Sequence, residues 1–135
     1  MATLNAYLMF NGDCREGMEF YKGCFGGELK IMTHGESPMA AQAPGELRDK
    51  VMHSFLKSGK IEFMGADCMD TCRHGNTVSL TLVCDSPEEI KQLFTKLSAG
   101  GKVGRALKEE FFGTYGDLTD RFGFSWMFQY SPNPM

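Results

Sequence analysis

The stretch TVSLTLVCDSPEE, residues 77–89, is one of two places where a strand candidate runs directly into a capped helix. Residues 77–84 are rich in apolar and β-branched side chains, which is typical of a strand. The Ser-Pro-Glu-Glu sequence at 86–89 then supplies the cap, the first-turn proline and the acidic residues of a helix start. At residues 4–16 an apolar run, an Asn-Gly turn and an acidic cap follow in the same order. The chain therefore carries one structural pattern twice.

The two copies lie 73 positions apart when their helix starts are aligned. This offset places Ser86 over Asp13 and Glu89 over Glu16, and both pairs have the spacing of a capping box. A glycine pair ends each helix pattern, with a slip of one residue between the copies. Two copies of an incomplete sheet can pair and leave a cleft where a ligand binds. The repeat therefore predicts a binding site.

Each copy is predicted to fold in the order β-α-β-β-β. The length of 135 residues, with 42% apolar and 23% charged side chains, fits one domain over 1–135. Its first module is expected at about 1–66 and its second at about 76–135. Helices are predicted at residues 13–25 and 86–97, and strands at residues 4–10, 28–33, 50–57, 60–66, 77–84, 102–107, 112–118 and 124–130.

The net charge of −3 provides no broad basic field, so neither nucleic acid nor an anionic membrane is an expected partner. No apolar window approaches the length of a membrane span, and the first residues lack the charged and apolar regions of a secretory signal. The chain has an odd number of cysteines, five, and most of them fall where a helix or strand would bury them. These features predict a cytoplasmic protein in a reducing compartment.

Cys68, Cys72 and His74 lie within seven residues and raise the question of a zinc site. Structural zinc sites usually combine a close cysteine pair with a second, distant pair of ligands, and the sequence offers no second pair. A surface or redox-sensitive thiol pair is the favoured interpretation.

The sequence resembles a known family in four blocks: residues 5–12, residues 20–29, residues 49–53, and the Phe-Phe-Gly at 111–113 together with residues 119–127. They resemble the PhnB-like branch of the vicinal oxygen chelate superfamily, which includes glyoxalases, bleomycin-resistance proteins and dioxygenases. The resemblance covers nearly the whole chain. It implies an α+β fold of two tandem βαβββ modules, with a curved mixed sheet around a cleft, and commonly a homodimer.

In metal-using relatives, the first and last strands of each module supply the ligands of a divalent ion. The resemblance places these positions at Ala6, Glu62, Ser79 and Met127, and Ala6 and Ser79 are themselves 73 positions apart. Alanine and methionine lack the oxygen and nitrogen donors that such ions require. No cofactor is therefore expected, and the alternative is a divalent metal held by Glu62 with a displaced ligand such as His53.

The predicted ligand cleft combines apolar side chains with scattered polar groups, a composition that favours binding of a small organic molecule. Glu62 is the best catalytic candidate, as a general base or as a hydrogen-bond acceptor, although a salt-bridged or solvated strand residue is an equal alternative. The orientation of His53 stays open, and so does the role of residues 34–49, as a lid, a contact arm or a surface loop. The expected cleft residues are Leu8, Phe10, Glu62, Met64, Ser79, Thr81, Met127 and Gln129.

The function predicted from these features is that of a PhnB-like protein with a small-molecule-binding cleft and an unknown ligand. The alternative is a glyoxalase- or dioxygenase-like metal-dependent enzyme that uses Glu62 and recruited ligands. A structural or interaction protein is a third interpretation. Methyltransferase and dinucleotide chemistry are disfavoured, because the glycine pairs follow helices instead of forming a loop after the first strand.

Overall fold

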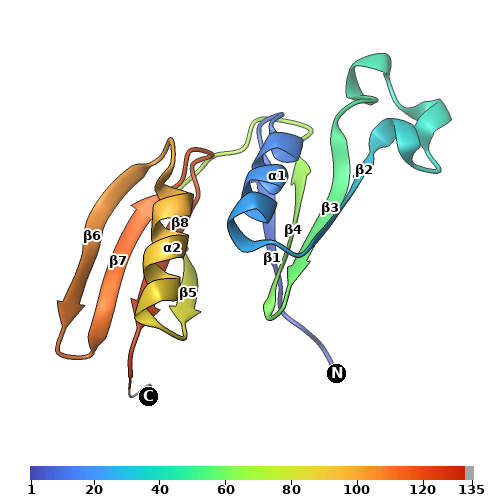
Figure 1. The fold of residues 1–135 in the computed structure, drawn as a ribbon. Helices are drawn as coiled ribbons and strands as arrows, with labels where there is room; N and C mark the ends of the chain where they lie inside the picture. The colour runs from blue at the N-terminus through green and yellow to red at the C-terminus, as the bar shows by residue number, and fades with distance from the viewer. Residues whose placement is uncertain (133–135) are drawn as a thin grey trace. The chain divides into compact units, whose positions relative to one another are not determined.

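Each half of the chain forms a four-stranded mixed sheet with one helix packed on one of its faces (Figure 1). The computed structural model describes residues 1–132. It divides the chain into two units, Met1–Cys72 and a second unit that begins at Arg73. This boundary falls inside the predicted junction between the two copies. The predicted β-α-β-β-β order is confirmed in both units.

The first unit consists of four strands, one helix and a long connection between β2 and β3. Its sheet has the order β1-β4-β3-β2, with β1 parallel to β4 and the other pairs antiparallel. Residues 34–49 contain three short 3-10 turns and fold back on themselves, since the Gly35 N–H donates to the Arg48 carbonyl at 2.9 Å. The elements are β1 (Ala6–Phe10), α1 (Cys14–Phe25), β2 (Glu28–Thr33), β3 (Val51–Ser58) and β4 (Ile61–Asp67).

The second unit repeats this topology, with the strand order β5-β8-β7-β6. Again the first and last strands of the unit are parallel neighbours and the other pairs are antiparallel. The elements are β5 (Leu80–Cys84), α2 (Pro87–Ser98), β6 (Lys102–Glu110), β7 (Gly113–Thr119) and β8 (Ser125–Tyr130).

The helix and the sheet of each unit meet through aromatic side chains. In the first unit, Tyr21 of α1 contacts Phe63 of β4 edge-on, with ring centroids 5.4 Å apart. In the second unit, Phe94 of α2 meets Phe128 of β8 at 5.0 Å. These four rings are at most 9% exposed, so each unit encloses a core between its helix and one face of its sheet.

The two helices begin differently, although the sequence predicts a capped start at both. The Ser86 hydroxyl accepts a hydrogen bond from the Glu89 N–H at 3.1 Å, as predicted. Asp13, by contrast, stands at the N-cap of α1 without a side-chain capping bond. The Cys14 N–H instead donates to the Asp67 carboxylate at 2.9 Å, and Asp67 belongs to β4. The predicted capping box of α1 is therefore wrong, because a more distant carboxylate takes the role.

A second correction concerns the alignment of the first strands. The helix starts are 73 positions apart, but the strand ends Phe10 and Cys84 are 74 apart, because the turn after β5 is one residue shorter than the turn after β1. Side chains alternate between the two faces of a strand, so a slip of one residue exchanges the faces. The equivalence of Ala6 with Ser79 is therefore wrong, and Tyr7 is the residue that corresponds to Thr81.

Candidate functional site

The face of the first sheet that α1 leaves uncovered is the candidate site, and it is called here the open face of the first unit. Phe10 and Phe63 lie on the covered face, since both rings contact Tyr21 of α1. Alternation along β1 and β4 then directs Tyr7 and Met64 to the open face, where they are direct neighbours across the parallel pair. By the same rule and register, the open face presents Tyr7, Met9, Lys30, Met32, His53, Phe55, Lys57, Glu62 and Met64.

This placement corrects the predicted orientation of Leu8 and Phe10. Both are core residues, 6% and 1% exposed, and the Phe10 ring lies against Gly17 of α1. Ala6 follows the same alternation and falls on the covered side. Their neighbours Tyr7 and Met9, 43% and 39% exposed, lie on the open face instead. β1 has the sequence AYLMF and is apolar or aromatic throughout, so no polar alternation indicates which of its side chains face the core.

A hydrogen bond between Tyr7 and His53 is the most specific polar feature of the open face. The Tyr7 hydroxyl and His53 Nδ1 are 3.0 Å apart, and the two ring centroids are 5.8 Å apart. The bond passes across β4, which lies between β1 and β3 in the sheet. Burial raises the pKa of the Tyr7 hydroxyl, so the hydroxyl keeps its proton at neutral pH. It donates to Nδ1 or accepts from the Nδ1–H, according to the tautomer of His53.

The orientation of His53 depends on an irregularity at the start of β3. His53 pairs with Met32, whereas the next pair of the ladder joins Val51 to Thr33, so one residue of β3 is left over. This bulge lets Val51 lie in the core at 1% exposed while His53 stays on the open face. Simple alternation would have placed Val51 and His53 on the same side. The bulge therefore settles an orientation that the sequence left open.

Glu62 also lies on the open face, but it is paired. Its carboxylate is 3.3 Å from the ammonium group of Lys57, its neighbour across β3 and β4, and the two side chains are 36% and 59% exposed. An exposed pair of this kind is screened by solvent and contributes little to stability. The surroundings of Glu62 thus match the salt-bridged strand residue that the sequence allowed as an alternative to a catalytic role.

The open face of the second unit also combines apolar and polar side chains. Phe128 lies against Phe94 of α2, so alternation along β8 directs Met127 and Gln129 to the uncovered face. Thr81 pairs with Met127 across the parallel strands and shares this face. Ser79 is exposed and precedes the first residue of β5.

An acceptor network occupies the β6 side of this face. Asp117 accepts a hydrogen bond from the Tyr115 hydroxyl at 3.0 Å and another from the Arg105 N–H at 2.9 Å. Burial and the neighbouring carboxylate raise the pKa of the Tyr115 hydroxyl, which therefore remains a donor. The second unit thus has a tyrosine–aspartate pair on the face where the first unit has a tyrosine–histidine pair.

A family model described as 3-demethylubiquinone-9 3-methyltransferase matches residues 2–129. The chain belongs to this PhnB-like family. It is 34% identical to protein PA1353 from Pseudomonas aeruginosa, whose crystal structure covers 97% of this chain and 98% of its own with a TM-score of 0.86. It is 32% identical to protein YjdN of Escherichia coli strain K12, over 92% of each chain.

A putative 3-demethylubiquinone-9 3-methyltransferase, a PhnB protein from Bacillus cereus, is 27% identical, with a TM-score of 0.77 over 96% of this chain and 100% of that one. A glyoxylase/bleomycin resistance protein/dioxygenase domain from Frankia is 12% identical, with a TM-score of 0.65 over 100% and 95% of the two chains. At that identity the likeness shows the fold alone. The PhnB-like chain thus has the α+β fold of the glyoxalase and bleomycin-resistance proteins.

The metal positions implied by the wider superfamily do not form a donor set in this PhnB-like chain. Ala6 and Met127 carry no oxygen or nitrogen donor, and Glu62 is engaged by Lys57. In the part of the chain that the structure describes, no three His, Cys, Asp or Glu side chains are grouped closely enough to hold a metal ion. The residues present do not fit the ion, and no reaction step is derived through it.

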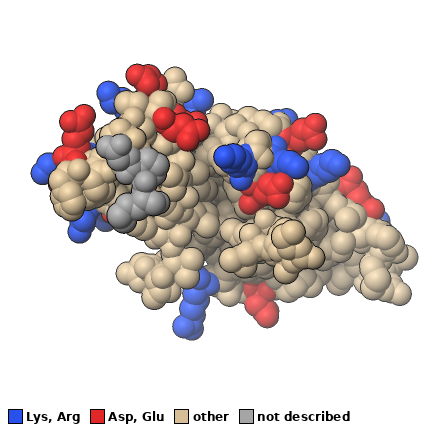
Figure 2. Space-filling model, turned by 90° about the horizontal axis from the view of Figure 1, so that it is seen from below, with Lys and Arg blue, Asp and Glu red and all other residues tan. Residues whose placement is uncertain are grey.

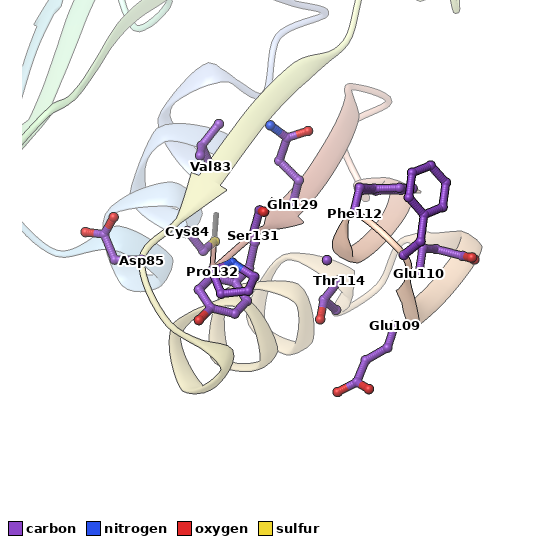
Figure 3. Close-up of a pocket in the computed structure, with 13 residues that line it drawn as sticks. Val83, Cys84, Asp85, Glu109, Glu110, Phe112, Thr114, Gln129, Ser131 and Pro132 are labelled. Atoms are coloured by element: carbon purple, nitrogen blue, oxygen red, sulfur yellow. The ribbon is translucent and has the colours of Figure 1, made fainter. Parts of the chain in front are cut away.

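An open hollow of about 1140 Å³ lies at one end of the second sheet of the PhnB-like chain (Figure 3). Gln129 is a predicted site residue that lines this hollow. Val83, Phe112 and Tyr130 line it as well and were not among the predicted site residues. The Asp85 and Glu109 carboxylates at its margin point away from the centre in Figure 3. Its lining thus combines apolar side chains with amide and hydroxyl groups.

Two further findings bear on partners. On the face drawn in Figure 2, Lys and Arg are interspersed with Asp and Glu, without a broad area of either sign. Within residues 1–132, no helix is long and apolar enough to cross a membrane.

Proposed function

We propose that this PhnB-like protein binds a small organic ligand on the open face of its first unit, with the Tyr7–His53 pair as the polar anchor. The pair lies among apolar side chains, since Met64 is the neighbour of both Tyr7 and Phe55 in the sheet. Ligand sites commonly combine an apolar lining with a few fixed polar groups. The hydrogen bond between Tyr7 and His53 is the observation that carries this proposal.

The chemistry of the pair limits the ligand class. We propose the tautomer of His53 in which Nδ1 accepts from the Tyr7 hydroxyl and Nε2 carries the proton. The Nε2–H is a directed donor, held in place by a neighbour that fixes the ring. It suits a ligand with a carbonyl or carboxylate acceptor and an apolar or aromatic body, which methionine side chains accommodate easily.

Thr81, Met127 and Gln129 on the open face of the second unit are proposed as a second ligand-contacting surface. They present a hydroxyl, a thioether and an amide at neighbouring positions of β5 and β8. These side chains are uncharged and can contact polar but uncharged parts of a ligand.

The anchor can be tested with matched tyrosine variants. Aromatic and aliphatic carboxylic acids and ketones are screened by ligand-observed NMR, and the dissociation constants of the hits are compared for wild type, Tyr7→Phe and Tyr115→Phe. Tyr7→Phe removes one hydrogen bond and is expected to weaken binding about tenfold, which corresponds to about 1.4 kcal/mol. Tyr115→Phe, which removes the same chemical group from the open face of the second unit, is expected to weaken binding less than Tyr7→Phe, because Tyr115 is not part of the anchor. Equal effects of both variants would contradict the proposal.

Metal content separates this proposal from the metal-dependent alternative. Native protein that contains close to one equivalent of nickel, zinc or iron, lost on Glu62→Ala, would contradict a metal-free binding function. Protein in which the content of these metals is the same before and after Glu62→Ala would support it. Elemental analysis of both proteins after identical purification gives the answer.

A cytoplasmic homodimer is also proposed. Large apolar side chains are exposed in the second unit, with Val78 at 77%, Val83 at 64% and Phe111 at 101% exposed. Such exposed apolar side chains are candidates for an interface between two copies of the chain. A monomeric mass in light scattering at micromolar concentration would contradict the dimer, and recovery of the protein in a periplasmic fraction would contradict the location.

A further inference from the structure

We propose that Cys68 and Cys72 form a reversible thiol–disulfide site, whose oxidation fixes the point where the connection between the two units begins. Their Cα atoms are 6.3 Å apart and their sulfurs are joined in the structure. That separation lies within the range of native disulfides. The first unit ends at Cys72. The proposal is independent of any ligand on the open faces.

The oxidised segment is docked on the C-terminal end of β1. The Cys68 N–H donates to the Phe10 carbonyl at 2.8 Å. The Asn11 side chain clamps the backbone of Cys72, since Oδ1 accepts from the Cys72 N–H at 2.7 Å and Nδ2 donates to the Cys72 carbonyl at 3.2 Å. Both cysteines are therefore held by the same short stretch, Phe10 and Asn11.

The residue before Cys68 is firmly anchored. Asp67 is 7% exposed and accepts hydrogen bonds from the Cys14 N–H and the Val51 N–H, each at 2.9 Å. The disulfide joins this fixed point to Cys72, so the chain gains freedom only from Arg73 onward. In the dithiol the covalent link is absent, and Cys72 is held by the Asn11 clamp. Its Sγ lies 3.7 Å from the Phe10 carbonyl, a contact that becomes a hydrogen bond only when the sulfur carries a proton.

The bond is better suited to switching than to stabilising the fold. The stabilisation that a disulfide gives through chain entropy grows with the length of the closed loop, and here the cysteines are four positions apart. Both cysteines are partly exposed, whereas the other three are buried. Burial raises the pKa of Cys14 to about 12 and that of Cys84 to about 11, so these two thiols react slowly. An oxidant would therefore act selectively on the pair.

The proposed reaction is thiol–disulfide exchange with a low-molecular-weight disulfide such as oxidised glutathione. The thiolate of one cysteine attacks a glutathione sulfur, breaks its S–S bond and releases one glutathione thiolate. The second cysteine then attacks the mixed disulfide and releases the second glutathione. Two cysteine thiols are oxidised to one disulfide, and one glutathione disulfide is reduced to two thiols.

The full-length protein is equilibrated in buffers with stepped ratios of reduced to oxidised glutathione, then quenched and alkylated after unfolding. Mass spectrometry should show a transition from three alkylated cysteines to five without loss of the folded state. In parallel, hydrogen exchange of the Cys72 amide should accelerate at least tenfold in the reduced protein. Unchanged exchange in the two states would overturn the proposed effect on the connection. A bond that resists dithiothreitol in the folded protein would overturn its reversibility.

Three variants control the experiment. Cys68→Ser should show the exchange rate of the reduced protein under oxidising conditions. Cys24→Ala, which removes a buried thiol, should leave the redox transition unchanged. Asn11→Ala should accelerate exchange of the Cys72 amide in both redox states, because it removes the clamp without touching the sulfurs. If Cys68→Ser fails to fold, Cys72→Ser gives the same comparison.

Discussion

The two units share one topology, but their helices are anchored at different distances along the chain. The start of α2 is stabilised by Ser86, its own N-cap residue. The start of α1 is stabilised by Asp67, which is 53 positions away in sequence and lies at the end of β4. Duplicated units can thus keep the order of their elements while the stabilising contact moves from local to tertiary. The open faces differ in the same way, with Tyr7 paired to histidine and Tyr115 paired to aspartate.

The largest effect is expected from the two buried carboxylates, one in each unit. Asp67→Ala leaves the N–H groups of Cys14 and Val51 without their acceptor and should lower the free energy of unfolding by about 3 kcal/mol. Asp120→Ala should cost a similar amount, since Asp120 accepts from the Trp126 Nε1–H at 2.8 Å and from the Phe122 N–H at 2.9 Å. Urea unfolding measures both. A loss below about 1 kcal/mol for Asp67→Ala would show that α1 is anchored by another contact.

The next effect tests how each helix meets its first strand. In the first unit the small residue Gly17 lies on the helix and the large residue Phe10 on the strand, in direct approach. The corresponding residues of the second unit are Ile90 and Cys84, with the sizes exchanged. Gly17→Ala should destabilise the protein by about 1–3 kcal/mol through overpacking against Phe10. Combining it with Phe10→Leu should recover part of the loss, and a double variant no better than the single one would contradict this explanation.

The buried thiols at the two strand–helix junctions should make the free energy of unfolding decrease as the pH rises in the alkaline range. The folded-state pKa of Cys14, about 12, lies above its ordinary value of 9.0. The contribution of the protonated thiol to the free energy of unfolding is therefore complete well below pH 9. It is lost between about pH 9 and pH 12, because in this range the thiol loses its proton in the unfolded chain but keeps it in the folded one. Between pH 8 and pH 10 the loss should be about 1.4 kcal/mol. Cys14→Ala should show a correspondingly flatter decline of unfolding free energy than wild type, and an equal slope would refute the assignment.

The smallest effects compare the two N-cap residues directly. Ser86→Ala removes a capping hydrogen bond and should cost about 1 kcal/mol of unfolding free energy. Asp13→Ala should cost only a few tenths of a kcal/mol, because the Asp13 side chain makes no capping bond. Thermal unfolding of the two variants under identical conditions distinguishes them. Equal losses of unfolding free energy would mean that the Asp13 side chain stabilises the start of α1 as Ser86 stabilises that of α2.

Much of the fold could be predicted from periodicity and from turn residues. The strand predicted at residues 28–33 matches β2 at both ends, and the boundaries of the others differ by at most three residues. The strand order within each sheet and the bulge at the start of β3 depend on contacts distant in sequence, which a local pattern does not contain.

The candidate site could be predicted only in part. Thr81, Met127, Gln129, Glu62 and Met64 lie on uncovered faces as their alternation suggested. The Tyr7–His53 pair could not be predicted by aligning the two helix starts. The turn after β1 is one residue longer than the turn after β5, and this exchanges the side chains that lie on the two faces of the strand. The carboxylate of Asp67 gave no local signal, because its partners become neighbours only when β4 pairs with β1 and β3.

The exchanged sizes of Gly17 with Phe10 and of Ile90 with Cys84 limit how the protein could be re-engineered. A symmetric chain that took one residue of this pair from each half would place either two large residues or two small ones at these positions. The first choice gives a clash and the second a void, and both lower stability. The two positions are therefore coupled within each unit, and a symmetrised chain would have to take both residues from the same half.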